Sequence, residues 1–202
     1  MIESLNVIRS LGLAPVFEDL YFGRDVPDGL ETYMRYPAEF RNTSLDDWQS
    51  LTSGGLVPIV DDGNLQEVCL FDTQRRRFVT KSIEEPAEIV QEFDSWQQYL
   101  AQRLLEIADS GLDDTELEDV ASTVGFERTA ELIALLDEME SMTDAEAEER
   151  AARFIRESAA WRRCRHLHRG VCDARTHRVP PDKASLARTI ASQRRGATPA
   201  FF

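Results

Sequence analysis

The side chains best suited to acid–base or metal chemistry gather near one end of this 202-residue chain. All three histidines lie beyond residue 160, as do two of the three cysteines. They include a two-cysteine, two-histidine set of the type that binds zinc tetrahedrally: Cys164, His168, Cys172 and His177. The spacing departs from zinc-finger patterns, because no close Cys-x-x-Cys pair is present. We therefore favour an Arg-rich segment with incidental ligands, and zinc binding is the weaker alternative.

The rest of the chain lacks a recognisable catalytic arrangement. Residues 1–165 contain no histidine, the residue that most often transfers protons near neutral pH. Cys69 stands in an apolar run, which predicts a buried, inert thiol rather than a nucleophile. Gly54 and Gly55 lack the spacing and the following Lys-Ser/Thr of a phosphate-binding loop. We expect a protein that is not an enzyme and that needs no cofactor.

An acidic turn at residues 61–64 is the remaining candidate for metal chemistry. Its sequence, Asp-Asp-Gly-Asn, superficially resembles a calcium loop but lacks the alternate-position acids and the terminal glutamate of an EF-hand. Gly and Asn tolerate positive φ, so a hairpin turn is the better interpretation. We expect the exposed carboxylates of Asp61 and Asp62, together with Trp48, to be secondary contacts for a partner.

Acidic residues dominate the middle of the chain. The net charge is −14, but residues 84–149 hold 21 acidic residues against only Arg103 and Arg128, a net charge of −19. Residues 151–202 are the opposite, with 12 basic and 3 acidic residues. The acidic stretch repels nucleic acid and anionic membranes and attracts basic partners. A simply solvated surface, including one of the halophilic kind, is the plainer alternative.

The first 55 residues are expected to contain few regular elements. Apolar residues at spacings of three predict a helix over 1–12, ended by Gly12. Residues 13–55 are rich in Pro and Gly and predict irregular structure, apart from a short strand at 32–36 and a helix capped by Ser44.

Residues 56–80 predict three short strands in a meander. The first, at 56–60, contains Pro58, whose missing N–H favours either an edge strand or a position of Pro58 near the start of the strand. The second, at 68–71, has apolar side chains on both faces, as in a central strand covered on both sides. The third strand is expected at 77–80.

Helices are expected over the following residues. Apolar residues recur at helical spacing from Trp96 to Ile107, and this helix starts either near Ser95 or already at Pro86. Gly111 is its expected C-cap.

Three further helices follow Gly111. The first is capped by Asp113 or Asp114, the second covers 127–141, and the third starts at a capping box formed by Thr143 and Glu146. The main candidates for contact with a basic partner cluster at the start of the first of these helices: Asp113, Asp114, Glu116, Glu118 and Asp119.

Four segments together resemble a known family. They are an apolar-Pro-Ile strand with an acid-Gly turn at 57–64, a strand closing in an Asp at 67–72, a third strand at 77–79 and a helix pattern at 89–100. In this pattern the chain resembles the SUKH superfamily. The resemblance implies an α+β domain, a twisted mixed β-sheet flanked by helices, without catalytic residues. Many bacterial members look like immunity proteins that bind and neutralise a cognate toxin, often a nuclease.

The sequence thus predicts three parts: a SUKH-like domain at 1–111, an acidic helical extension at 112–160 and an Arg-rich, flexible tail at 161–202. No secretory signal or membrane-spanning run is recognisable, and the odd number of cysteines favours reduced thiols, so we expect a cytoplasmic protein. We expect an immunity protein that neutralises a basic, nuclease-type toxin through its acidic surface. An intracellular adaptor or regulatory interaction module is the alternative, and neither nucleic acid nor membrane is an expected partner.

Overall fold

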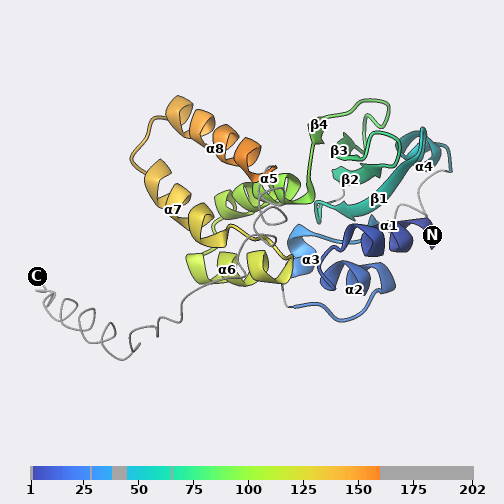
Figure 1. The fold of residues 1–202 in the computed structure, drawn as a ribbon, viewed down its shortest axis with the longest axis horizontal. Helices are drawn as coiled ribbons and strands as arrows, with labels where there is room; N and C mark the ends of the chain where they lie inside the picture. The colour runs from blue at the N-terminus through green and yellow to red at the C-terminus, as the bar shows by residue number, and fades with distance from the viewer. Residues whose placement is uncertain (1, 28, 38–44, 65, 160–202) are drawn as a thin grey trace, which may run out of the picture. The chain divides into compact units, whose positions relative to one another are not determined.

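The computed structural model of the chain describes residues 2–27, 29–37, 45–64 and 66–159. These residues form an α+β architecture of one four-stranded sheet and helices (Figure 1), within a compact unit that spans Met1–Arg165. The candidate zinc ligands lie outside the described residues. The elements are, in chain order, α1 Ile2–Leu11, α2 Val16–Phe22, α3 Leu30–Tyr33, α4 Leu45–Thr52, β1 Leu56–Asp61, β2 Glu67–Asp72, β3 Arg77–Ser82, β4 Gln91–Phe93, α5 Trp96–Asp109, α6 Asp114–Thr123, α7 Thr129–Met139 and α8 Asp144–Ser158.

The sheet is a meander in the order β1-β2-β3-β4, and each neighbouring pair is antiparallel. The predicted meander is therefore confirmed, and so is the edge position of β1, whose pairing with β2 is irregular next to Pro58. The mixed sheet implied by the family resemblance is wrong for the described strands, because none of them is parallel to a neighbour. Short turns join β1 to β2 and β2 to β3, and such turns can only reverse the chain direction.

The central strand β2 is covered on both faces, as predicted. Cys69 and Phe71 belong to the main hydrophobic cluster, whereas Val68 and Leu70 belong to a second, smaller cluster. Leu51 of α4 packs into the smaller cluster, so α4 helps to cover that face. The alternation follows from the two-residue period of a strand, and both faces stay apolar because each is covered.

The strand β4 was not predicted. Phe93 continues the helical spacing of α5 backwards, but it lies in the strand that pairs with residues 78–80 of β3. The helix starts later, at Trp96, because Ser95 adopts an extended backbone and its side chain accepts a hydrogen bond from the Gln98 N–H. Of the two predicted starts, the one at Ser95 is confirmed and the one at Pro86 is wrong.

The N-terminal region is more regular than the sequence predicts. The helix α1 ends as predicted before Gly12, and α4 begins one residue after Ser44, which itself lies outside the described residues. The short helices α2 and α3 occupy part of the segment expected to be irregular. The strand predicted at 32–36 is wrong, because Tyr33 ends α3 and only Arg35 forms an isolated bridge, to Asp61 of β1.

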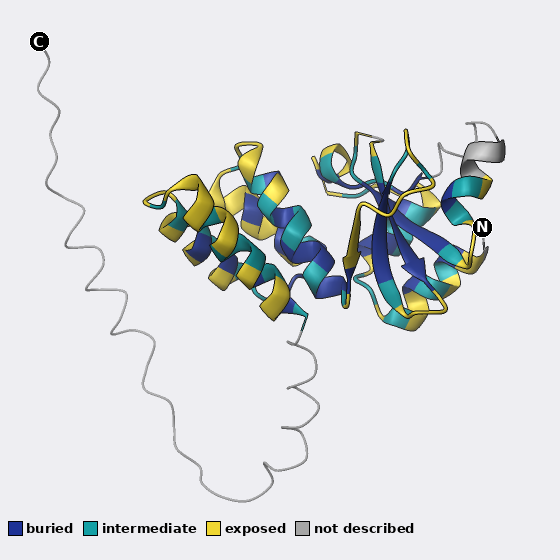
Figure 2. Cartoon of the chain, turned by 90° about the horizontal axis from the view of Figure 1, so that it is seen from above, coloured by how far each residue is buried: buried dark blue, intermediate teal, exposed yellow. Residues whose placement is uncertain are grey.

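One hydrophobic cluster runs from α1 to α8. It contains Ile8 of α1, Phe17 of α2, Leu104 of α5, Leu117 of α6 and Phe154 of α8, all of them buried. Figure 2 shows this buried interior continuing from the strands into the helices that follow them. The cluster therefore passes through both ranges that the sequence assigns to separate parts, 1–111 and 112–160.

Two of the three C-terminal helices begin where their caps predict, whereas α7 begins at Thr129, two residues later than expected, and Arg128 before it forms no side-chain cap. Asp113 and Glu116 form a reciprocal capping box at the start of α6, and Thr143 and Glu146 form another at the start of α8. The helix α5 packs against both α6 and α8. None of the described helices combines the length and the apolar character that crossing a bilayer requires.

Candidate partner-binding surface

The five main candidate residues lie together on α6 and its cap, and all of them are exposed. None of these carboxylates forms an ion pair with another residue in the described part of the chain. Leu117 and Ala121 point into the core from the same helix, so the spacing of the apolar residues turns the acids outward. This acidic face of α6, made by Asp113, Asp114, Glu116, Glu118 and Asp119, is the candidate surface.

Two of the five acids also cap the helix. The Asp113 side chain accepts a hydrogen bond from the Glu116 N–H at 2.9 Å, and Glu116 accepts one from the Asp113 N–H at 3.2 Å. The charges of Asp114 and Glu116 also favour the positive end of the helix dipole. Glu118 and Asp119 lie beyond the first turn, where the dipole gives little stabilisation. Their charge has no structural role in the described contacts.

A groove borders this acidic face. It has a volume of about 380 Å³ and lies between α6 and the segment that contains α3. One wall comes from the N-terminal region and the other from α6 and the residue before its cap: Pro27, Gly29, Leu30, Tyr33, Leu112, Glu116, Asp119, Val120 and Thr123. The groove therefore combines an apolar lining with two carboxylates of the acidic face.

Arg103 of α5 holds the α3 wall of the groove in place. Its guanidinium donates to the backbone oxygen of Tyr33 at 3.0 Å and to that of Asp62 at 2.6 Å. It also pairs with Glu106 at 2.8 Å, and only 15% of the Arg103 side chain is exposed. The Tyr33 carbonyl at the end of α3 thus receives a charged hydrogen-bond donor. Through these contacts Arg103 connects α3 with α5 and with the β1–β2 turn.

The secondary candidates in the β1–β2 turn are engaged within the fold. Asp61 is only 1% exposed, lies 3.7 Å from Arg35 and accepts a hydrogen bond from the Gly63 N–H. A side chain at Gly63 would overlap the backbone carbonyl of Thr32, so the turn is pressed against α3. The expected exposure of Asp61 is therefore wrong, because its carboxylate is buried and accepts a hydrogen bond within the turn.

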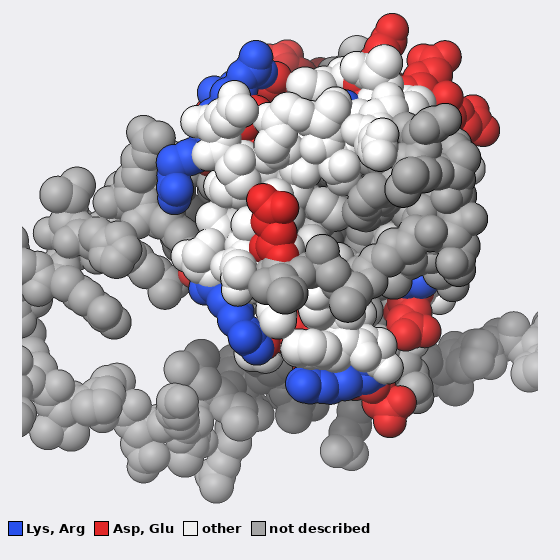
Figure 3. Space-filling view, turned by 90° about the vertical axis from the view of Figure 1, so that its right-hand side faces the viewer, with Lys and Arg blue, Asp and Glu red and all other residues white. Residues whose placement is uncertain are grey.

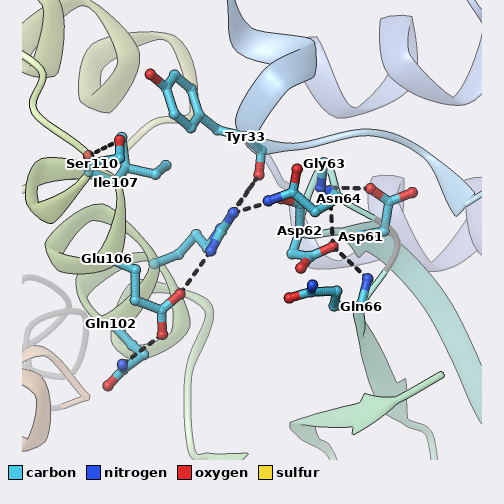
Figure 4. Close-up of polar contacts among 11 residues, drawn as sticks. Tyr33, Asp61, Asp62, Gly63, Asn64, Gln66, Gln102, Glu106, Ile107 and Ser110 are labelled. Atoms are coloured by element: carbon cyan, nitrogen blue, oxygen red, sulfur yellow. Dashed lines mark hydrogen bonds and ion pairs between the residues drawn. The ribbon is translucent and has the colours of Figure 1, made fainter. Parts of the chain in front are cut away.

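Asp62 and Trp48 complete the secondary set. The Asp62 carboxylate accepts hydrogen bonds from the backbone N–H groups of Asn64 and Gln66, each at 3.1 Å, and Figure 4 shows both contacts. This confirms the turn, and it leaves Asp62 with a structural role beside any role in binding. Trp48 lies within α4, but its side chain is outside the described part of the structure.

Charges near the strands are mostly paired. Glu92 of β4 receives Arg77 at 2.6 Å and Arg75 at 3.2 Å, and Asp72 accepts hydrogen bonds from two backbone N–H groups of the β2–β3 turn. Figure 3 looks at the sheet end of the unit, where acidic and basic side chains are scattered among uncharged ones. The part of this face that is not covered in grey carries no continuous acidic field.

The thiol of Cys69 is buried, as predicted. Burial raises its pKa well above the ordinary thiol value, so the reactive thiolate is disfavoured. Burial likewise raises the pKa of Tyr99 on the facing helix. Among the described residues, no group of three or more His, Cys, Asp or Glu side chains is arranged to hold a metal ion.

The sequence identified the acids of α6 but not the groove beside them. Pro27 and Gly29 belong to the Pro- and Gly-rich segment for which irregular structure is expected, but they precede the short helix α3 and line the groove. Gly29 has a φ of 84°, which lets the chain turn into that helix. The sequence feature that could indicate this helix is Pro27 and Gly29 followed by the apolar Leu30, which is 1% exposed in the structure.

Comparisons with known proteins gave no match for this chain. No protein family model matches it, no curated protein matches it, and no solved structure matches its fold.

Proposed function

We propose that this chain is a non-catalytic binding protein that neutralises a basic, nuclease-type protein toxin through the acidic face of α6. The observation that carries the proposal is the set of exposed carboxylates on α6 that have no ion-pair partner among the described residues. Glu118 and Asp119 give the strongest support, because neither helix capping nor the helix dipole explains an acidic residue at these two positions.

Local charge of one sign has a direct physical consequence for binding. It raises the rate of encounter with an oppositely charged protein and suppresses encounters with acidic ones. Enzymes that act on nucleic acid bind phosphates through basic surfaces. A carboxylate-rich helix placed on such a surface competes with the phosphates, so binding and neutralisation are one event.

The family resemblance supports the same proposal. Residues 55–107 resemble the SUKH superfamily, in which many bacterial members look like immunity proteins. We also propose a cytoplasmic protein, because the odd number of cysteines favours reduced thiols. Under this proposal the sheet serves as a scaffold, because Asp72 is engaged in a turn and Glu92 in ion pairs. The scaffold holds α5, and α5 packs against α6.

Co-expression with the products of the neighbouring genes tests the proposal. We expect one product to stop growth of the host cell, this chain to restore growth, and the two proteins to co-purify. Failure of every neighbouring product to stop growth would overturn the toxin part, and so would a toxic product that this chain neither binds nor neutralises. Binding to a non-toxic neighbour would instead favour an adaptor or regulatory module.

A matched pair of single variants links rescue to the acidic face. Asp119→Asn removes a carboxylate that borders the groove, and Glu85→Gln removes an exposed carboxylate between β3 and β4. Both variants change the net charge by the same amount. We expect Asp119→Asn to weaken rescue at limiting expression and Glu85→Gln to leave it unchanged, whereas equal effects would point to overall charge alone.

A further inference from the structure

We propose that the groove between α3 and α6 is a subsite for an arginine side chain of the partner protein. The inference rests on the proposed function, since it specifies how a basic partner is held. It adds a class of ligand, a guanidinium on an apolar stem, and it names the residues that receive it. The groove volume of about 380 Å³ lies at the lower end of the range typical of ligand pockets.

The apolar wall suits the stem of a long basic side chain. Leu30, Val120 and Leu112 line the groove, and Leu30 itself is only 1% exposed. Arginine and lysine bury their methylene stems on apolar surface while the charged head stays near water or a partner charge. An uncharged apolar ligand would leave the groove carboxylates without a counter-charge, so a cationic occupant fits better.

The acidic wall suits the charged head. Glu116 and Asp119 are three residues apart on α6, so they lie on the same side of the helix, and both line the groove. Glu116 already accepts the hydrogen bond from the Asp113 N–H, whereas Asp119 has no hydrogen-bond or ion-pair partner among the described residues. Asp119 is therefore the carboxylate that is available to a guanidinium.

Arginine is preferred to lysine for two physical reasons. A guanidinium presents several N–H donors in a planar fork and can bond two acceptors at once, whereas an ammonium is a compact point charge that holds its water more strongly. A planar guanidinium also stacks on aromatic faces, and Tyr33 is part of the lining. The groove should therefore discriminate between the two cations rather than respond to charge alone.

Argininamide and lysinamide are the probes for this inference. Each is titrated into the full-length protein, and the backbone amide shifts are followed by NMR at a fixed salt concentration. We expect argininamide to give saturable shifts at Gly29, Tyr33 and residues 116–123, and lysinamide to bind at least about threefold more weakly. Equal binding of both probes, or shifts spread evenly over all acidic segments, would overturn the inference.

Two variants on the same helix form the matched comparison. Asp119→Asn should weaken argininamide binding about fivefold, because it removes an ionic hydrogen bond in a partly open site. Glu118→Gln removes the same charge from a residue outside the groove lining and should change binding by about twofold or less. Equal losses in the two variants would reduce the effect to general electrostatics and overturn the inference.

A third variant fills the groove from within. Thr123 lines the groove four residues after Asp119, so Thr123→Arg places a guanidinium within reach of the Asp119 carboxylate. We expect this variant to abolish argininamide binding while its far-ultraviolet circular dichroism stays unchanged. Thr123→Gln, which is polar but shorter than arginine and uncharged, should retain binding. Undiminished binding by Thr123→Arg would overturn the assignment of the ligand to this groove.

The probe experiment fails independently of the growth experiment. If argininamide binds as expected but no neighbouring product is neutralised, the groove assignment stands and the toxin proposal falls. If the chain rescues growth but argininamide shows no selective binding, the groove assignment alone falls.

Discussion

The strands and α6 handle their carboxylates in opposite ways. In the sheet, Asp61 and Asp72 accept backbone hydrogen bonds and Glu92 receives two arginines. On α6, Glu118 and Asp119 have no ion-pair partner in the described part of the chain. Asp61, Asp72 and Glu92 thus stabilise turns or connect strands, whereas Glu118 and Asp119 face solvent. Charge that folding does not need is the better guide to a binding surface.

Burial explains why the two regions differ. An ionised group near the core needs a hydrogen-bond or charge partner, because removing the partner of a buried charge costs about 3–5 kcal/mol. Lys81 of β3 shows this need, since its ammonium donates to the backbone oxygen of Pro86 at 2.8 Å and burial lowers its pKa. Exposed acids on a helix do not need such a partner within the fold, so the binding of another protein can determine their number and position.

Truncation of Phe154 should have the largest effect on stability. The side chain is 1% exposed in α8, and the Arg128 guanidinium carbon lies 4.4 Å from its ring centroid. Phe154→Ala should lower the unfolding free energy by about 3–5 kcal/mol, measured by urea denaturation. Ile89→Ala, at a 42% exposed site, should cost about 0.5 kcal/mol or less.

The same variant tests whether the helices and the sheet unfold together. One cluster joins them, so the loss at Phe154 should lower hydrogen-exchange protection in β2 as well as in α8. Unchanged protection in β2 would show that the 112–160 helices form a separate unit, as the sequence suggested.

Removal of the Arg103 guanidinium should have the next largest effect. Arg103→Met keeps the stem but loses the donors to the Tyr33 and Asp62 carbonyls, so it should cost about 1.5–3 kcal/mol. Arg24→Met is the control, because Arg24 forms an exposed pair with Asp19 and should cost about 0–1 kcal/mol. Similar losses in both variants, measured by thermal and urea unfolding, would contradict a structural role for Arg103.

Substitutions at Asp113 separate capping from charge. Asp113→Ala removes the cap of α6 and should cost about 1 kcal/mol in urea unfolding. Asp113→Ser keeps a capping oxygen without the charge, so stability should stay close to that of the parent protein. A loss as large as that of the alanine variant would mean that charge, rather than the capping hydrogen bond, stabilises the helix start.

The smallest effect is expected at Glu67 of β2. Partial burial raises its pKa, and the nearby Glu106 and Asp62 carboxylates raise it further. The folded-state pKa lies above the unfolded one, so the ionised form destabilises the fold near neutral pH. This destabilisation disappears as the pH falls through the raised pKa.

Glu67→Gln should therefore stabilise the protein at about pH 7, and its advantage should shrink toward about pH 4. Glu85→Gln, at an exposed site, is the control and should show little change in melting temperature at either pH. A constant advantage of Glu67→Gln across this range would contradict the electrostatic explanation.

The strand meander and the helix caps could be predicted from the sequence because local signals determine them. The turn at Asp61–Asn64 was identified from its Gly and Asn, and α8 from its Thr143 capping box. Both signals act through backbone conformation and hydrogen bonds within a few residues, which a sequence displays directly.

The remaining features depend on contacts between distant residues. The strand β4 is three residues long and exists because Phe93 pairs with Phe78, which is a contact with no local signature. The groove likewise needs α3 to lie beside α6, and part of that placement comes from Arg103, 70 residues beyond Tyr33. Residue spacing in the sequence could therefore predict the acidic α6 wall of the groove but not the α3 wall opposite it.

The central claim is that the carboxylates of α6, unlike acids elsewhere, bind the partner. Two variants with the same change in net charge test it directly, by their affinity for the toxin that co-purifies with this chain. The first neutralises α6 and keeps its capping box with glutamine: Asp114→Asn, Glu116→Gln, Glu118→Gln and Asp119→Asn. The second neutralises exposed acids elsewhere: Glu3→Gln, Glu84→Gln, Glu85→Gln and Glu88→Gln.

We predict that the α6 variant binds about 100-fold more weakly at about 0.15 M salt, while the control variant stays within about threefold of the parent protein. Equal weakening by the two variants, or full affinity of the α6 variant, would contradict the claim.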